Sequence, residues 1–115
     1  MMTSTLFAFV AALQTAPLPA AACSPATGFV GTLCVPASSG KHPAMLSLGS
    51  SEGGNSIAPL GTTFAQQGYV AASVAYFGLP SFPQTLREIP VETLGRAFTA
   101  IENRADVDSQ RIAMF

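Results

Sequence analysis

Apolar runs of strand length alternate along the chain with turns rich in glycine, serine and proline. Residues 27–36 alternate in polarity and carry β-branched and aromatic side chains, which predicts a strand. Residues 44–48 form a short apolar run typical of a buried strand, followed by a turn rich in glycine and serine at 49–54. Nearly continuous apolar runs at 70–75 and from residue 111 onwards predict two further strands.

Helical periodicity fills the gaps between the last three of these strands. The first predicted helix follows the glycine turn, with Asn55 or Ser56 as its N-cap. Its apolar face has helical spacing and consists of Ile57, Leu60, Gly61 and Phe64. The second begins at Pro90, and its predicted buried side consists of Val91, Leu94, Phe98 and Ile101. We expect Glu92 and Arg96, which are four residues apart, to pair on its surface.

The order of these elements is strand, strand, helix, strand, helix, strand. The β-α-β alternation after residue 44 predicts an α/β fold with a mostly parallel sheet, right-handed crossovers and helices on both faces. The chain of 115 residues is long enough for one domain with a modest core. The sequence contains no internal repeat and no second domain of its own.

Residues 1–22 have the pattern of a secretory signal peptide. An apolar run at 6–13, too short to span a bilayer, is followed by prolines and by three alanines at 20–22 that fit a cleavage site before Cys23. The first five residues carry no lysine or arginine, so a misassigned start is the alternative. We expect a secreted or periplasmic protein, with a cytoplasmic one as the alternative, and residues 23–115 as the N-terminal part of one domain.

Charge and composition exclude several classes of function. The formal net charge is −1, and no basic patch indicates a nucleic-acid partner. No apolar stretch is long enough for a stable membrane span. With two cysteines and one histidine there is no metal-binding motif, and no cofactor is expected.

The two cysteines, Cys23 and Cys34, leave several alternatives open. They can form a disulfide in an exported protein or remain as two thiols. Cys23 directly follows small residues, as in a bacterial lipoprotein, but Ala20 occupies the position where such a site has leucine. Cys34, within a predicted strand, is expected to be a small buried residue.

The glycine turn carries the candidate chemistry. A buried strand that delivers a flexible turn to a helix N-terminus can place backbone N–H groups around an oxyanion. The residues that would do so are Gly49, Ser50 and Ser51. The alternative is a turn that only connects a strand to a helix.

Several spaced motifs resemble one branch of the α/β-hydrolases. They are Leu48-Gly49-Ser50-Ser51-Glu52-Gly53-Gly54, Gln67-Gly68-Tyr69-Val70, Val74-Ala75-Tyr76-Phe77-Gly78, Leu86, Ile89-Pro90-Val91-Glu92 and Val107-Asp108-Ser109-Gln110-Arg111-Ile112. The branch is the C-terminal catalytic domain of acyl-CoA thioesterases and bile acid-CoA:amino acid N-acyltransferases. The dienelactone hydrolases share its general layout.

This resemblance implies a partial α/β-hydrolase sheet that stops before the nucleophile. In the family, the turn after the third strand, here Gly49 to Ser51, supplies part of the oxyanion hole. The nucleophile follows the strand that here begins at Arg111, in a Gly-x-Ser-x-Gly type of elbow. The acid and the histidine come later still, so we expect no catalytic residue within this chain.

Other polar residues near the turn have structural interpretations. His42 is expected on a surface loop before the first core strand, because no catalytic partner pattern surrounds it. Glu52 favours a helix N-terminus by its charge. Ser47, like Ser50 and Ser51, lies outside any Gly-x-Ser-x-Gly context and is not expected to be a nucleophile.

The leading hypothesis is the N-terminal part of a secreted acyl-transfer hydrolase for a small-molecule ester or thioester, inactive by itself. Export fits poorly with an acyl-CoA substrate, which is intracellular, so the acyl substrate is left open. The alternative is a small non-enzymatic secreted α/β binding module. A fragment without independent function is the third hypothesis.

Overall fold

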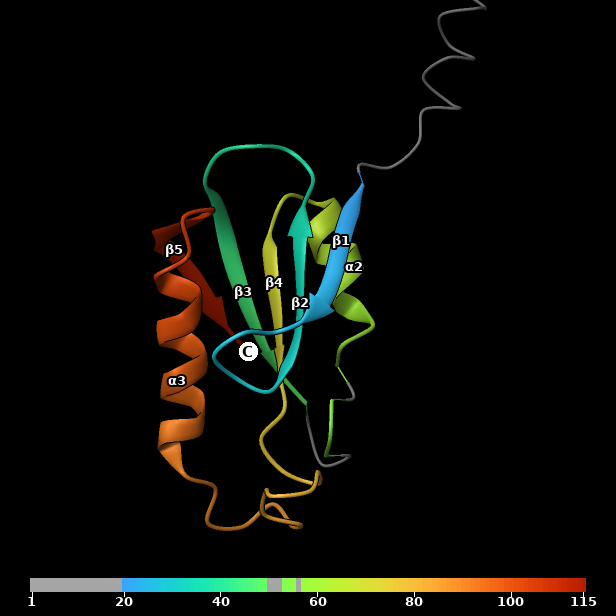
Figure 1. Cartoon of the computed structure of the whole chain (residues 1–115), viewed down its shortest axis with the longest axis vertical. Helices are drawn as coiled ribbons and strands as arrows, with labels where there is room; N and C mark the ends of the chain where they lie inside the picture. Colours follow the sequence, from blue (N-terminus) through green and yellow to red (C-terminus); the bar gives the residue numbers. More distant parts are fainter. Residues whose placement is uncertain (1–19, 50–52, 56) are drawn as a thin grey trace, which may run out of the picture.

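The computed structural model describes residues 20–49, 53–55 and 57–115. Within these ranges the chain forms five strands and two helices (Figure 1). In chain order they are β1 (Ala21–Pro25), β2 (Gly31–Pro36), β3 (His42–Leu48), α2 (Leu60–Gln66), β4 (Val70–Val74), α3 (Val91–Glu102) and β5 (Val107–Met114). The predicted signal peptide lies outside the described residues as far as residue 19.

All five strands form one sheet in the order β1-β2-β4-β3-β5. β3 pairs in parallel with both β4 and β5, so that Leu46 lies between Ala72 and Met114. β2 is antiparallel to both of its neighbours, β1 and β4, so two of the four pairings in the sheet are antiparallel. The predicted fold, a mostly parallel α/β-hydrolase sheet with helices on both faces, is wrong. The sheet is mixed, and the described residues form only two helices.

One of the two antiparallel pairings, β1 with β2, involves a strand that the sequence pattern did not reveal. β1 occupies residues 21–25, where the sequence pattern predicts the end of a signal peptide and no strand. Only residues 26–30 join β1 to β2, whereas parallel neighbours need a crossover of about a dozen residues or more. The short connection therefore forces β2 to run back along β1.

Each face of the sheet has its own core, because neighbouring residues of a strand point to opposite sides. The larger core includes α3 and consists of Leu33, Ala44, Leu46, Val70, Ala72, Val74, Ala97, Ile101 and Val107. The smaller core includes α2 and consists of Cys34, Ala65 and Ala71. α2 has seven residues and packs against β1, β2 and β4.

The face of α3 that meets the sheet agrees with the predicted one at Ile101 and differs from it elsewhere. Thr93, Ala97 and Ile101 are the buried residues of the helix. Leu94 and Phe98 pack at the margin of the core, and Val91 is 76% exposed. Two of the innermost positions, Thr93 and Ala97, carry small side chains, so an assignment based on the bulkiest apolar residues misses them.

The first helix is shorter than its periodicity predicted. α2 begins at Leu60, and Pro59 is its N-cap. Asn55, one of the predicted caps, instead donates a side-chain hydrogen bond to the hydroxyl of Thr32. Ser56, the other, lies outside the described residues.

Cys23 and Cys34 lie opposite each other in the β1–β2 ladder and form a disulfide. Cys34 is buried, as predicted, whereas Cys23 is exposed. A bonded Cys23 sulfur is not free to carry a lipid. α2 packs closely on this bond, since a Cβ at Gly61 would lie 2.7 Å from the sulfur of Cys34. Glycine is therefore required at this contact.

Candidate functional site

The parallel strands β3, β4 and β5 end together at what we call the carboxyl edge of the sheet, marked by Leu48, Val74 and Met114 (Figure 1). The N–H of Leu48 donates to the carbonyl of Phe115 at 2.8 Å, and the N–H of Phe115 donates to the carbonyl of Leu46 at 2.9 Å. The residues that follow β3 and β5 are therefore neighbours. In α/β sheets, ligands bind outside the carboxyl ends of the strands.

The predicted oxyanion turn begins at this edge. Gly49 is half-buried there, and its carbonyl accepts a hydrogen bond from the hydroxyl of Tyr76. Ser50 and Ser51 lie outside the described residues, as does Glu52. The proposed role of the Gly49 to Ser51 backbone therefore stays a prediction.

The chain beyond this turn is attached to the residues that follow β4. Gly53 and Gly54 both have positive φ angles, +75° and +61°, a conformation that glycine adopts without steric cost. The N–H of Gly54 donates to the carbonyl of Phe77 at 2.7 Å. A Cβ at Gly53 would lie 3.1 Å from the ring of Phe77, so the two segments are in close contact.

Asn55 provides a third attachment. Its side-chain nitrogen donates to the hydroxyl of Thr32 on β2 at 2.8 Å. Its side-chain oxygen is buried and has no hydrogen-bond partner among the described residues. The segment after β3 is thus held to β2 at this point and to the residues after β4 at two others.

The sequence did not predict that Tyr76 and Phe77 anchor the segment that follows β3. Tyr76 and Phe77 belong to a motif that carried the family resemblance, but the motif alone gave them no role. Their function as anchors depends on the pairing of β3 with β4 in space. The signal that could have found them is an aromatic pair directly after a buried strand, placed to reach the neighbouring turn.

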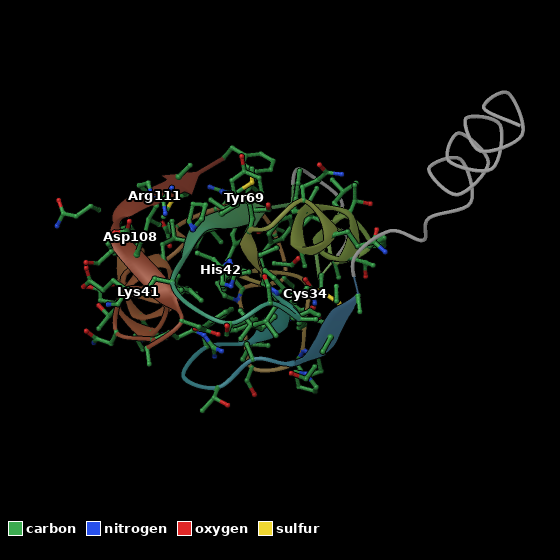
Figure 2. The ribbon with its side chains drawn as sticks, turned by 90° about the horizontal axis from the view of Figure 1, so that it is seen from above. Cys34, Lys41, His42, Tyr69, Asp108 and Arg111 are labelled. Carbon is green, nitrogen blue, oxygen red and sulfur yellow. A yellow bond between two sulfur atoms is a disulfide. The ribbon has the colours of Figure 1, made fainter. Side chains whose placement is uncertain are left out.

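His42 lies at the opposite end of the sheet, among charged residues (Figure 2). It is the half-buried first residue of β3 and not a loop residue as predicted. Its Nε2 lies 3.0 Å from the carbonyl oxygen of Ser38, and its backbone N–H donates to the carbonyl of Asp106 at 2.9 Å. The fold therefore separates His42 from the glycine turn by the length of the strand.

Two aspartates near this end have lowered pKa values. A two-point hydrogen bond from Arg104 lowers the pKa of Asp106, and the charge of His42 acts in the same direction. The backbone N–H of Gln110 and the side chain of Arg111 lower the pKa of Asp108. Both carboxylates are thus engaged in local structural contacts. Neither lies at the carboxyl edge.

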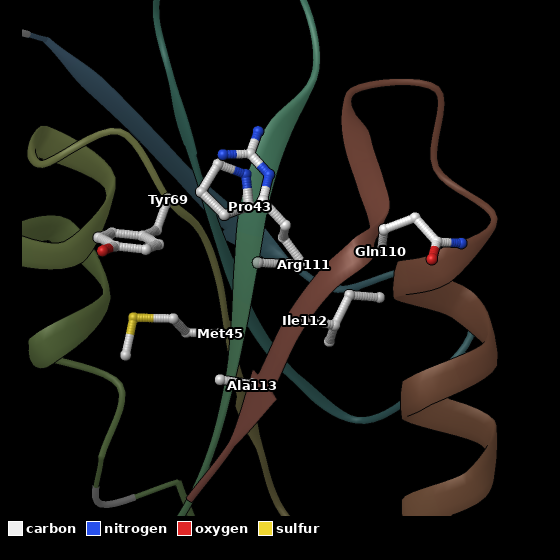
Figure 3. A pocket seen from close by; sticks show the side chains of 8 residues that line it. Pro43, Met45, Tyr69, Gln110, Arg111, Ile112 and Ala113 are labelled. Atoms are coloured by element: carbon white, nitrogen blue, oxygen red, sulfur yellow. The ribbon is translucent and has the colours of Figure 1, made fainter.

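A hollow of about 390 Å³ lies on the α2 side of the sheet, beyond the end of that short helix (Figure 3). Tyr69 stands at one side and β5 at the other, with Met45 and Ala113 in its floor. Pro43, the second residue of β3, also lines this hollow, which therefore lies toward the amino ends of the strands. This hollow is therefore separate from the glycine turn.

The described residues contain no group of three histidine, cysteine, aspartate or glutamate side chains arranged to hold a metal ion. In the same part of the chain, no helix has the length and apolar character needed to cross a membrane.

Comparison of the chain with protein-family models and with curated proteins finds no match. The carboxyl edge and the sequence motifs are therefore the features that point to a function.

Proposed function

We propose that this chain is the N-terminal part of an acyl-transfer hydrolase that acts on a small-molecule ester or thioester. The observation that carries the proposal is the pairing of Leu48 with Phe115 at the carboxyl edge. A nucleophile placed directly after β5 would stand beside the turn that begins at Gly49. Acyl transfer requires this juxtaposition, because oxyanion donors must lie about 3 Å from the reacting oxygen.

The attachments around the turn support the same role. The carbonyl of Gly49 and the N–H of Gly54 flank the turn, and both are bonded to residues that follow β4. Backbone donors stabilise an oxyanion best when their positions are fixed before the reaction. In this proposal, backbone N–H groups of Gly49 to Ser51 bind the oxyanion, while the nucleophile, acid and histidine come from residues beyond Phe115.

The disulfide supports a site of action outside the cytoplasm. Disulfides such as Cys23–Cys34 form and persist in oxidising compartments. A secreted or periplasmic enzyme would meet esters more readily than acyl-CoA, so an ester is the favoured substrate class.

The test begins with the coding sequence beyond Phe115. We expect a Gly-x-Ser/Cys-x-Gly pattern within the next handful of codons, followed by an acid and a histidine. The longer product should hydrolyse p-nitrophenyl acetate or a short acyl thioester and lose this activity when the elbow residue is replaced by alanine. The 115-residue chain should show no turnover above buffer.

Two results would contradict the proposal. One is a stop codon after Phe115 with no neighbouring reading frame that carries the elbow. The other is turnover by the 115-residue chain that clearly exceeds that of a Ser50→Ala/Ser51→Ala control.

A further inference from the structure

A second hollow, which we call the α3 hollow, lies between α3 and two loops at the carboxyl edge. Its volume is about 340 Å³, and it is lined by Gly28, Phe29, Val30, Phe82, Thr93 and Arg96. Three of these side chains are large and apolar, and Thr93 and Arg96 add a hydroxyl and a guanidinium. The volume falls within the range of small-molecule sites, about 300–1,000 Å³.

The guanidinium of Arg96 has no carboxylate partner within the described residues. The ion pairs there are Arg104–Asp106 and Arg111–Asp108, so the expected pair between Glu92 and Arg96 does not form. Arg96 lines the α3 hollow and the adjoining surface of α3, whereas Glu92 lines only the latter. The guanidinium of Arg96 thus stands beside the apolar wall without an ion-pair partner among the described residues.

The walls of the hollow are attached to the candidate site. The carbonyl of Val30 accepts a hydrogen bond of 2.9 Å from the N–H of Ala75, the residue before Tyr76. Val30 is 52% exposed, and an exposed apolar residue beside a hollow is available for contact with a ligand. The apolar wall therefore faces solvent at the edge where α/β folds bind small molecules.

We propose that the α3 hollow binds a monocarboxylate with a short apolar body, such as a medium-chain fatty acid. The planar guanidinium of Arg96 matches a carboxylate and can donate two parallel hydrogen bonds to it. Phe29, Val30 and Phe82 offer the surface on which an alkyl chain loses its contact with water. Among the described residues, Arg96 is the one cation that lines the hollow, and Glu92 lies one turn away on the same helix. A ligand with a single negative charge is therefore favoured over a dianion.

The proposal concerns binding alone and stands apart from acyl transfer by this chain or by a longer protein. A chain without any hydrolase activity would still bind the carboxylate in the α3 hollow. Conversely, an active longer product could lack this binding, so an experiment can contradict either proposal without contradicting the other.

The experiment is a titration of the full chain with octanoate below its micelle concentration, followed by isothermal calorimetry and by NMR of the Val30 methyl groups. Octanol serves as the uncharged ligand of the same chain length. We expect octanoate to bind about tenfold more tightly than octanol, which corresponds to one charge-assisted contact of about 1.4 kcal/mol. Arg96→Gln should remove this preference, because it removes the cation.

Two further variants complete the design. Arg87→Gln makes the same chemical change at an exposed loop position outside the hollow and should leave octanoate binding unchanged. Val30→Ser should weaken octanoate and octanol alike, since it shortens the apolar wall without changing the charge. All three positions are exposed, so the variants should retain the fold, which circular dichroism checks.

The proposal is overturned if octanoate shows no saturable binding to the wild-type chain. Equal octanoate affinity in Arg96→Gln and Arg87→Gln would also overturn it. So would equal binding of octanoate and octylamine, because the hollow would then act only as an apolar surface.

Discussion

The hydroxyl of Tyr76 donates a hydrogen bond to the carbonyl oxygen of Gly49, which lies 27 positions earlier in the sequence. The two residues follow neighbouring parallel strands, β4 and β3. The bond therefore joins the beginnings of two turns at the carboxyl edge. It fixes the residue from which the predicted oxyanion turn starts.

Tyr76→Phe should loosen this turn while leaving the sheet intact. The change removes one part-buried hydrogen bond, and the expected loss of unfolding free energy is about 0.5–1.5 kcal/mol. Urea denaturation measures this loss, and hydrogen exchange at Gly53 and Gly54 reports the local effect. Tyr69→Phe, at the chain's other tyrosine, is the matched control. Similar exchange at Gly53 and Gly54 in both variants would show that the Tyr76 hydroxyl does not hold the turn.

Gly61→Ala and Gly95→Ala should act in opposite directions, although both place alanine within a helix. A Cβ at Gly61 would lie 2.7 Å from the sulfur of Cys34, whereas a Cβ at Gly95 meets nothing within 4 Å. We expect Gly61→Ala to lower the free energy of unfolding by about 1–3 kcal/mol through overpacking. Gly95→Ala should raise it by about 0.5–1 kcal/mol through helix propensity. Thermal denaturation of the pair is sufficient, and stabilisation by Gly61→Ala would contradict the close packing of α2.

Loss of the Cys23–Cys34 bond should lower the free energy of unfolding by about 2–3 kcal/mol, since the bond restricts the unfolded chain. The variant Cys23→Ala/Cys34→Ala removes the bond without leaving a thiol. Denaturant midpoints with and without a phosphine reductant measure the effect. The reductant should destabilise the wild-type chain and leave the double variant unchanged. A wild-type midpoint that does not respond to the reductant would indicate that the bond is absent in solution.

The Arg104–Asp106 pair should contribute stability that depends on pH. The pKa of Asp106 is below its ordinary value of 3.8 in the folded chain. Its contribution is therefore complete above the unfolded pKa and is lost as the pH falls through the folded pKa. The two side chains are 33% and 34% exposed, so we expect at most about 1 kcal/mol.

Asp106→Asn tests this dependence. The variant should be less stable than the wild-type chain near neutral pH, and the difference should shrink as both are moved to pH values below the folded pKa. Urea midpoints across this range provide the measurement. If Asp106→Asn lowers the free energy of unfolding by the same amount at every pH, the loss comes from packing and not from charge.

Export should leave Cys23 as the first residue of the mature protein. The predicted cleavage removes Ala21 and Ala22 from β1, where they pair with Pro36 and Val35, and it keeps the disulfide. N-terminal sequencing of protein from the medium or periplasm checks this boundary. An intact Met1 in a cytoplasmic product would contradict export.

Local sequence patterns locate the central elements well. The apolar run at 44–48 lies in β3, the run at 70–75 extends one residue beyond β4, and the second helix begins next to Pro90. β1 could not be found in this way, because its short alanine-containing segment lacks alternation and also fits a cleavage site. The sheet is mixed because β2 pairs antiparallel with β4, whereas β3 pairs in parallel with β4. Such pairings between distant segments are not encoded by hydrophobic periodicity.

The candidate site, like the fold, could be predicted from the sequence only in part. Glycine and serine after a buried strand predicted a turn from Gly49, which does follow β3 directly, while its role toward an oxyanion stays a prediction. The partners that hold the turn, Tyr76 and Asn55, depend on which strands lie next to β3. The Glu92–Arg96 pair was expected from spacing alone, and spacing does not determine which neighbouring surface the arginine side chain covers.

The position of β3 between β4 and β5 has a consequence for the time course of folding. During synthesis, β3 and β4 can pair as soon as both have left the ribosome, but the other edge of β3 must wait for residues 107–114. Contacts between segments so distant in sequence form slowly, because closing the intervening chain costs entropy first. An open apolar strand edge is also a template for aggregation. The arrival of β5 therefore covers the second edge of β3, the strand that carries the fully buried Leu46.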